Sequence, residues 1–347
     1  MHVSHILLLR KCLPYGLGAS FNDIFTQSNF GIVLEANFKL MKKCEYECAF
    51  SFSVSSDEEL QKISVLIQDL FDNSIITSIP KVFDKRRCET TFCSKFYAFA
   101  KGQGHALSRE EVKKSFEDSW GDKAWTFVTS LRGPREVVQS KLRYIEEKLN
   151  DMATLRVIDR QLLKDTPVET LQEKLQIQFD HLVLDYLQGI PSNDALMSSY
   201  WDLCDFDETP EQPEAKDYAF LYITPLFPNK PSDIEGYMSI YKEVCERFSV
   251  SPAMTLNFLN RNSIEAVITV SFDKKNPFIV KKTHHFKDEL LKSLALKGYL
   301  PYRLDVASMS KFFEETIEQT AWESFSLKIK KALDPDELLA PKRYSSR

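Results

Sequence analysis

The sequence reads Pro14-Tyr15-Gly16-Leu17-Gly18 and then Phe25-Thr26-Gln27-Ser28-Asn29-Phe30-Gly31-Ile32-Val33, and these two stretches decide the interpretation of the fold. The first is a loop whose glycines permit backbone angles that other residues resist, so it can turn tightly and approach a ligand closely. The second places three polar side chains before a glycine and an apolar run. From Gly31 to Leu40 the pattern passes into alternation, which predicts a strand.

Two segments near the end of the chain belong with these: Gly298-Tyr299-Leu300-Pro301-Tyr302-Arg303 and Asp334-Pro335-Asp336-Glu337-Leu338-Leu339-Ala340-Pro341. Together, the four segments resemble the vanillyl-alcohol oxidase and para-cresol methylhydroxylase family of FAD-linked oxidoreductases. Shorter segments extend the resemblance across the cap domain of that family: Leu131-Arg132-Gly133-Pro134-Arg135-Glu136, Gln188-Gly189-Ile190-Pro191-Ser192 and Tyr200-Trp201.

The resemblance implies an α+β fold. It predicts a ferredoxin-like cap domain, an antiparallel sheet with helices, over residues 44–297, flanked by the C-terminal part of a PCMH-type FAD-binding domain at 1–43 and 298–347. In the family the first segment closes the FAD-binding domain, and here only 13 residues precede Pro14. We therefore interpret the chain as the later part of a split or truncated flavoenzyme, with the pyrophosphate-binding half on a separate polypeptide.

Hydrophobic periodicity predicts the elements of the cap domain. Residues 46–54 alternate as a strand, and Ser56 with Glu59 has capping-box spacing before a helix with an apolar stripe from Leu60 to Leu70. Strand character resumes at 75–80, so strand, helix and strand open a ferredoxin-like module. Further expected elements are strands at 124–131, 219–226, 253–257 and 264–272 and helices at 135–149, 234–248, 285–297, 310–320 and 322–333.

Tyr302 and Arg303 are the strongest candidates for catalysis. The Arg guanidinium is permanently charged and offers a planar fork of donors, and the phenol adds one more. Fixed donors in a low-dielectric cavity stabilise a phenolate effectively. In the resembling family, a Tyr-Arg pair in this place binds the phenolic oxygen of the substrate. Asp23 stands near the position where several members carry an acidic base or flavin-tuning group.

The resemblance also implies contacts to FAD from the front segments. The residues concerned supply polar side chains or leave room for the ring system: Gly18, Gln27, Ser28, Asn29, Gly31 and Ile32. Members that tether flavin covalently use a His or Tyr on a cap strand. The segment 218–225 contains no His, and its Tyr218 and Tyr222 are interpreted as core residues rather than as tethers. FAD is therefore expected to be non-covalent, or absent from the isolated chain.

Composition excludes several other classes of function. Hydrophobic content of 43% and charged content of 27% are ordinary for a globular protein, and a net charge of -5 argues against a nucleic-acid partner. No apolar run reaches the length of a membrane span, so a cytoplasmic protein is expected. The seven cysteines lack metal-ligand spacing and predict free thiols and no metal. His284 and His285 are interpreted as the solvent-facing start of a helix.

Two functions follow from these residues. The first is an FAD-linked oxidoreductase that oxidises a phenolic or related alcohol by hydride transfer to flavin. Its ligand would be a small aromatic or alcohol substrate, and its partner would be a separate FAD-binding polypeptide. A homo-oligomer is also compatible with this function. The alternative is a non-catalytic cap-domain remnant that acts as a ligand- or partner-binding module.

Overall fold

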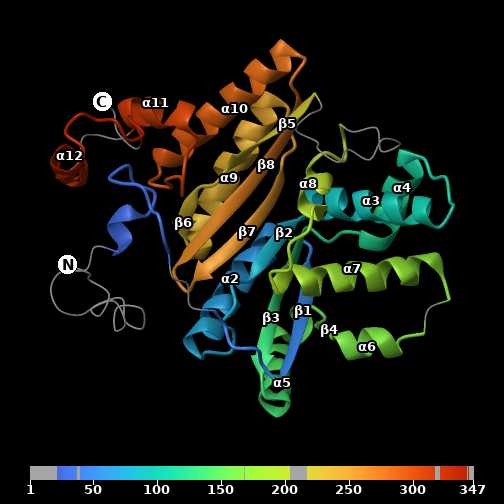
Figure 1. Cartoon of the computed structure of the whole chain (residues 1–347). Coiled ribbons are helices and arrows are strands. Elements are labelled where there is room, and N and C mark those ends of the chain that lie inside the picture. The colour runs from blue at the N-terminus through green and yellow to red at the C-terminus, as the bar shows by residue number, and fades with distance from the viewer. Residues whose placement is uncertain are drawn as a thin grey trace. The chain divides into compact units, whose positions relative to one another are not determined.

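The computed structural model describes residues 22–36, 40–167, 169–203, 217–316, 321–341 and 343. The chain divides into two compact units (Figure 1). Unit 1 combines Met1–Lys43 with Arg303–Arg347, and unit 2 is Cys44–Tyr302.

Unit 2 contains an antiparallel sheet that is eight-stranded in the described part of the chain. Its strands are β1 (Tyr46–Val54), β2 (Lys81–Asp84), β3 (Trp125–Gly133), β4 (Arg156–Ile158), β5 (Tyr218–Ile223), β6 (Leu226–Pro228), β7 (Ala253–Asn260) and β8 (Ser263–Asp273). They pair in the order β4-β1-β3-β2-β7-β8-β5, and β6 also pairs with β8.

The helices of unit 2 are α2 (Asp57–Asp72), α3 (Lys85–Gly102), α4 (Arg109–Trp120), α5 (Arg135–Leu149), α6 (Arg160–Asp165), α7 (Leu171–Leu187), α8 (Asp194–Ser199), α9 (Pro231–Phe248) and α10 (Pro277–Ala295), with a short 3-10 turn at Asn150–Met152. Unit 1 contains the 3-10 turn η1 (Asn22–Phe25) and the helices α11 (Val306–Thr316) and α12 (Ala321–Leu333). Within the described residues, none of these helices is long and apolar enough to cross a membrane.

The sheet consists of two ferredoxin-like modules placed side by side. The first runs β1, α2, β2, β3, α5 and β4, and its strand order is β4-β1-β3-β2. The second runs β5, α9, β7, β8 and α10 with the order β5-β8-β7. The chain after α10 then takes the place of the fourth strand, because Pro301 forms a bridge with Pro225. This architecture confirms the predicted α+β fold with a ferredoxin-like antiparallel sheet and helices.

The two faces of the sheet differ, because side chains alternate along each strand. On the apolar face, alternate residues of β8 from Ile264 to Phe272 are buried. Helices α2, α5, α9 and α10 lie on this side. Phe227 stacks on Tyr237 of α9 with ring centroids 4.3 Å apart, and the Tyr237 hydroxyl donates to Met254 Sδ at 3.2 Å. These contacts form the main core.

On the opposite face, which we call the polar face, β7 and β8 carry mostly polar side chains. Helices α3, α7 and α8 lie on this side (Figure 1). Arg87 of α3 donates a hydrogen bond to Thr269 Oγ1, and Ser271 Oγ donates to the Ser199 carbonyl at the end of α8. The helices therefore attach to this face through hydrogen bonds as well as packing.

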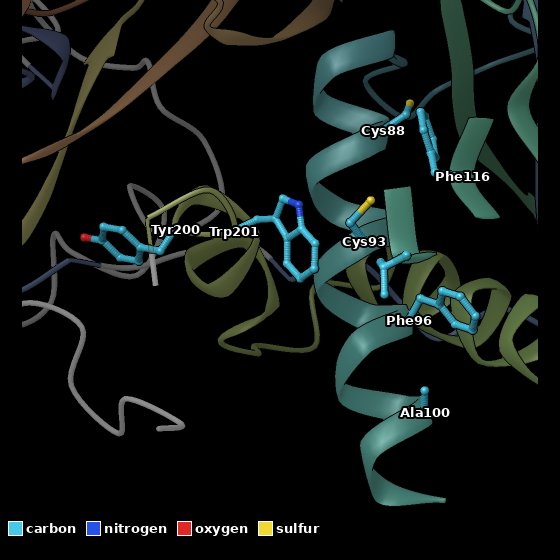
Figure 2. Close-up of a cluster of buried hydrophobic side chains, with 8 residues drawn as sticks. Cys88, Cys93, Phe96, Ala100, Phe116, Tyr200 and Trp201 are labelled. Carbon is cyan, nitrogen blue, oxygen red and sulfur yellow. The ribbon is translucent and has the colours of Figure 1, made fainter. Parts of the chain in front are cut away.

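A second core joins α3, α4 and α8 (Figure 2). Its buried members are Cys88, Cys93, Phe96, Ala100, Val112, Phe116, Tyr200 and Trp201. Tyr200 is 1% exposed and Trp201 is completely buried, and the Arg109 guanidinium lies 5.1 Å from the Trp201 ring. The Tyr-Trp segment that supports the family resemblance is thus a core element of the insertion between the modules.

Several predicted elements match the structure closely. β1 and α5 have the predicted bounds, and the stripe from Leu60 to Leu70 is buried. Ser56 caps α2 by accepting the Glu59 N–H, as the spacing predicts. The helix expected at 285–297 instead begins at Pro277, because Asn276 accepts from the two N–H groups after that proline. The predicted helix start at His284 and His285 is therefore wrong: both lie inside α10, with exposed side chains.

Two predicted strands are wrong. Residues 75–80 form no strand, because the Ile75 and Ile76 N–H groups return to the Leu70 carbonyl and extend the C-terminal turn of α2; β2 begins only after Pro80. The strand expected from Gly31 to Leu40 is also missing: residues 31–36 pair with no strand in the described part of the chain, and 37–39 lie outside it. A strand needs a neighbour for its backbone hydrogen bonds.

Candidate functional site

Tyr302 lies at the edge of the sheet, where two backbone hydrogen bonds hold it. The Leu226 N–H donates to the Leu300 carbonyl at 2.8 Å, and the Tyr302 N–H donates to the Thr224 carbonyl at 2.7 Å. Leu226 is paired with Glu265, so this register places Tyr302 on the polar face. The side chain of Tyr302 is 45% exposed. Its phenol is therefore a donor and acceptor at the accessible rim of the polar face.

The preceding residues anchor this segment. Gly298 has φ +81°, a left-handed conformation that favours glycine, and it ends the turn after α10. Tyr299 is buried, and its hydroxyl donates to Asp233 Oδ1 at 3.0 Å. Burial, with help from this hydrogen bond, raises the pKa of Tyr299 to about 12. A Cβ at Gly236 would lie 3.2 Å from the same hydroxyl, so α9 has a small residue where Tyr299 docks.

Three polar side chains from adjacent strands form a hydrogen-bonded row across the polar face. Lys81 on β2 is paired in register with Asn257 on β7, and Asn257 is paired with Glu265 on β8. Lys81 Nζ donates to Asn257 Oδ1 at 3.2 Å, and Asn257 Nδ2 donates to Glu265 Oε2 at 2.9 Å. The amide of Asn257 thus connects a cation to a carboxylate, and these two hydrogen bonds fix the orientation of the amide.

The row has hydrogen-bonding capacity beyond these two bonds. A lysine ammonium has three donors, and Lys81 gives one to Asn257 while lying 5.1 Å from the ring of Tyr186 on α7. A carboxylate is an acceptor only, and Glu265 accepts at one oxygen. Tyr186 and Tyr222 are both about half exposed. This combination of a donor, an acceptor and phenol rings suits a small planar ligand with a hydroxyl group.

Sequence reasoning missed Lys81, Asn257 and Glu265. The available signal was the polar residue at alternate positions of two otherwise apolar strands. That signal identifies a face of each strand, but it does not say which residues lie opposite each other, since register depends on pairing.

In unit 1, Lys330 of α12 connects two of the segments that carry the family resemblance. Its ammonium donates to the Asn29 carbonyl and to the Leu339 carbonyl, each at 2.7 Å, and to Asp334 Oδ2. The Asn29 amide donates to the Ala340 carbonyl at 3.2 Å. The side chains of Lys330 and Asp334 are 6% and 7% exposed. Three donors with three acceptors make Lys330 a fully satisfied buried cation.

The remaining predicted residues fall into three groups. Ser28 Oγ accepts the Phe30 N–H at 3.5 Å, Gln27 has φ 55°, and Gly31 lies beside the Phe25 ring. Asp23 belongs to η1, and Arg303 is an exposed residue at the start of the second part of unit 1. Gly18 lies outside the described residues.

The described residues of unit 1 fit only part of FAD. Ile32, Val33 and Leu34 are 73%, 62% and 93% exposed and form a short apolar stretch next to Gly31, which suits the flat ring system. The side-chain N–H group and the main-chain carbonyl of Asn29 bond within the chain. A pyrophosphate needs several convergent backbone donors, and the described part of unit 1 has no glycine-rich loop ahead of a helix that would supply them.

Metal-ligating groups do not gather in the described residues, where no cluster of three His, Cys, Asp or Glu side chains is found. The described cysteines at positions 44, 48, 88, 93 and 245 are free thiols. Burial raises the pKa of Cys48 and Cys245 to about 11 and that of Cys93 to about 12. These thiols are protonated at neutral pH and do not act as nucleophiles.

Comparison with known proteins relates the chain to flavoprotein oxidases of the para-cresol methylhydroxylase type. No family model matches the chain. It is 22% identical over 345 residues to 1'-carboxy-chondrochloren decarboxylase of Chondromyces crocatus, which covers 96% of this chain and 62% of that protein. It is 20% identical over 337 residues to the flavoprotein subunit of 4-cresol dehydrogenase (hydroxylating) of Pseudomonas putida, covering 96% and 58%.

A solved structure shares the fold. The 4-ethylphenol oxidase from Gulosibacter chungangensis, in complex with isoeugenol, superposes with a TM-score of 0.74 at 18% identity, covering 96% of this chain and 60% of the oxidase. The chain therefore spans about 60% of the length of the proteins that it matches.

Replacing Lys330 tests the connection within unit 1. Hydrogen bonds from Lys330 and from the Leu339 N–H lower the pKa of Asp334. In Lys330→Met the carboxylate loses its cation, so we expect the amides of Leu338 and Leu339, which donate to Asp334, to exchange hydrogen faster. Hydrogen-exchange mass spectrometry measures this. Lys331→Met, at the exposed neighbour, is the matched control.

The same exchange should respond to pH. Because the pKa of Asp334 is lower in the folded protein, its contribution to stability is present above the ordinary aspartate pKa of about 3.9 and is lost as the pH falls through the folded value. Exchange at Leu338 and Leu339 that is equal in Lys330→Met, Lys331→Met and the parent protein would refute the role of Lys330.

Proposed function

We propose that this chain is the substrate-covering and closing portion of an FAD-linked oxidoreductase that oxidises a phenolic or related alcohol. One observation carries the proposal: Tyr302 stands on the polar face of the sheet together with the hydrogen-bonded row of Lys81, Asn257 and Glu265. The named activities of the relatives on 4-cresol and 4-ethylphenol support a small aromatic substrate.

In this proposal the chain binds, orients and polarises the substrate. FAD held beside the segment from Gln27 to Ile32 would supply the hydride-accepting chemistry. The phenol of Tyr302 and the guanidinium of Arg303 hold the substrate oxygen as it gains negative charge, because donors fixed in advance stabilise an oxyanion strongly. Lys81 and Glu265 supply a further donor and acceptor on the same face, and Tyr186 and Tyr222 offer rings for stacking.

We also propose that the remainder of the FAD site comes from residues beyond those described. The chain matches about 60% of its relatives' length, and its described residues offer no pyrophosphate cradle. A separate polypeptide that carries the pyrophosphate-binding half would complete the site. The exposed apolar run from Ile32 to Leu34 supports this, since such a run is stabilised when another surface covers it.

Purification from the native cells tests the assignment of cofactor and partner. The protein carrying a tag after Arg347 should come with a yellow flavin band in the visible spectrum and with a polypeptide that contains the pyrophosphate-binding half. Mass spectrometry identifies that polypeptide, and acid release identifies FAD. Protein that is colourless from native cells, and stays colourless after incubation with FAD, would contradict the proposal and favour a non-catalytic binding module.

Replacement of the oxyanion donors tests the catalytic roles. In the flavin-loaded protein, Arg303→Ala should raise the barrier for substrate oxidation by about 2.7–4 kcal/mol, the scale for losing one oxyanion donor. Tyr302→Phe should also lower kcat, because it removes the second donor. Arg261→Ala, which removes an exposed arginine paired with Asp72, is the control. Stopped-flow flavin reduction by 4-cresol measures the rate, and an unchanged rate in Arg303→Ala excludes the assigned role.

Ligand binding to the polar face tests the Lys81 row independently of flavin. Lys81→Met should weaken binding of 4-ethylphenol by about tenfold or more, since a hydrogen bond to a charged group contributes about 1.5–3 kcal/mol. Lys62→Met, an exposed change in α2 on the apolar side of the sheet, should leave binding unchanged. NMR titration of the purified chain measures both affinities. Equal affinity in the two variants would exclude Lys81 from the site.

A further inference from the structure

A separate pocket opens at one end of the sheet, on the side away from the polar face. Its volume is about 290 Å³, and it lies where α2 begins, β2 ends, and β3 and β7 start, beside α9. All of its lining residues belong to unit 2. Figure 1 shows the elements that surround it. None of its lining residues takes part in the proposed oxidation.

The wall of the pocket is apolar and aromatic. Met254 of β7, Met238 and Tyr241 of α9, and Trp125 of β3 line it, and all four side chains are largely buried. The Trp125 N–H is already used, because it donates to Asp57 Oδ1 at 2.9 Å. Thioethers and ring faces adapt to compact apolar groups, and ring faces attract cations.

The pocket lining carries three cations and three carboxylates, and they differ in how they are paired. Its cations are each in an ion pair: Lys242 with Asp57, Lys85 with Glu117 at 2.8 Å, and Arg86 with Glu89 at 2.7 Å and with Asp202. Two of its carboxylates, Asp84 and Asp122, have no ion pair within the described residues. The two carboxylates without an ion pair therefore favour a positively charged ligand.

Asp84 is the central carboxylate. Its Oδ1 accepts the Arg87 N–H at 2.6 Å and the Met254 N–H at 3.0 Å, which fixes the side chain at the start of α3. No hydrogen bond is found for its Oδ2 within the described part of the chain. Burial raises the pKa of Asp84 to about 6, against the two backbone hydrogen bonds and the nearby charges of Arg87 and Arg86, which lower it. A bound cation would restore the stabilisation that the carboxylate loses with its water.

We propose that this pocket binds a small organic cation, an amine with a compact apolar or aromatic body. The ammonium group would lie against Asp84, with Asp122 at the rim, and the body would pack on Met238, Met254 and Tyr241. The volume limits the ligand to a small molecule. For a ligand of this size we expect a dissociation constant in the micromolar to millimolar range. The site is independent of the polar face and of flavin.

Three probes of similar size and different charge test the proposal: benzylamine, benzyl alcohol and benzoate. The chain contains seven methionines, so labelling of their methyl groups with carbon-13 gives a simple NMR spectrum in which Met238 and Met254 report on the pocket. We expect benzylamine to shift both signals with millimolar affinity. Benzyl alcohol and benzoate should bind at least about tenfold more weakly, as one ionic hydrogen bond requires.

Asp84→Asn isolates the charge. Asparagine is as good an N-cap as aspartate and keeps the acceptor for Arg87 and Met254, so the fold is retained. In this variant the affinities for benzylamine and benzyl alcohol should become equal. Asp118→Asn, at an exposed residue of α4 outside the pocket, should behave as the parent protein.

Three results with the parent protein would overturn the proposal. These are equal affinity of the parent protein for benzylamine and benzyl alcohol, tighter binding of benzoate, and unshifted Met238 and Met254 signals with all three probes at their solubility limits. Preference for benzylamine that survives Asp84→Asn would also overturn it, because the selectivity would then arise elsewhere.

Discussion

The antiparallel pairing of β2 with β7 joins the two ferredoxin-like modules into one sheet, and the chemistry of the polar face depends on it. β2 has only four residues, and its register places Lys81 opposite Asn257 and Phe83 opposite Thr255. A slip of one residue would turn the Lys81 side chain toward the apolar core and bring Val82 to the polar face. Val82 is buried in that core, which opposes such a slip. Burial of one valine thus helps to fix a hydrogen-bonded row that crosses three strands.

Local sequence patterns predicted the elements that carry their own periodicity. The alternation in 46–54 and the stripe from Leu60 to Leu70 are properties of single segments, and the structure has them where the patterns place them. Helix α3 is not among the predicted elements, although Cys88, Phe92 and Phe96 recur at helical spacing and its cysteines belong to the buried stripe. Free thiols often serve as small core hydrophobes, and here they do.

Features that depend on pairing with a neighbouring strand were not predictable from a single segment. The run from Gly31 has the composition of a strand, yet a strand forms only where a neighbour accepts its hydrogen bonds, and the described residues provide none. The row of Lys81, Asn257 and Glu265 presents the converse case, since three unremarkable polar residues acquire a role only through register. Among the site residues proposed from the family resemblance, Tyr302 lies at the edge of the sheet, and Gly298 and Tyr299 explain how it is held there.

The two sides of the sheet separate two kinds of electrostatics. On the polar face, Lys81 and Glu265 are connected through one amide, so the row is neutral as a whole and can meet a neutral phenol without a net field. At the pocket on the apolar side, each cation of the lining is in an ion pair, and Asp84 has no ion pair within the described residues. A neutral ligand gains little there, because it does not offset the desolvation of a carboxylate. The same fold thus presents a neutral hydrogen-bonding surface where we propose oxidation of a phenol, and a carboxylate without an ion pair where we propose a cation.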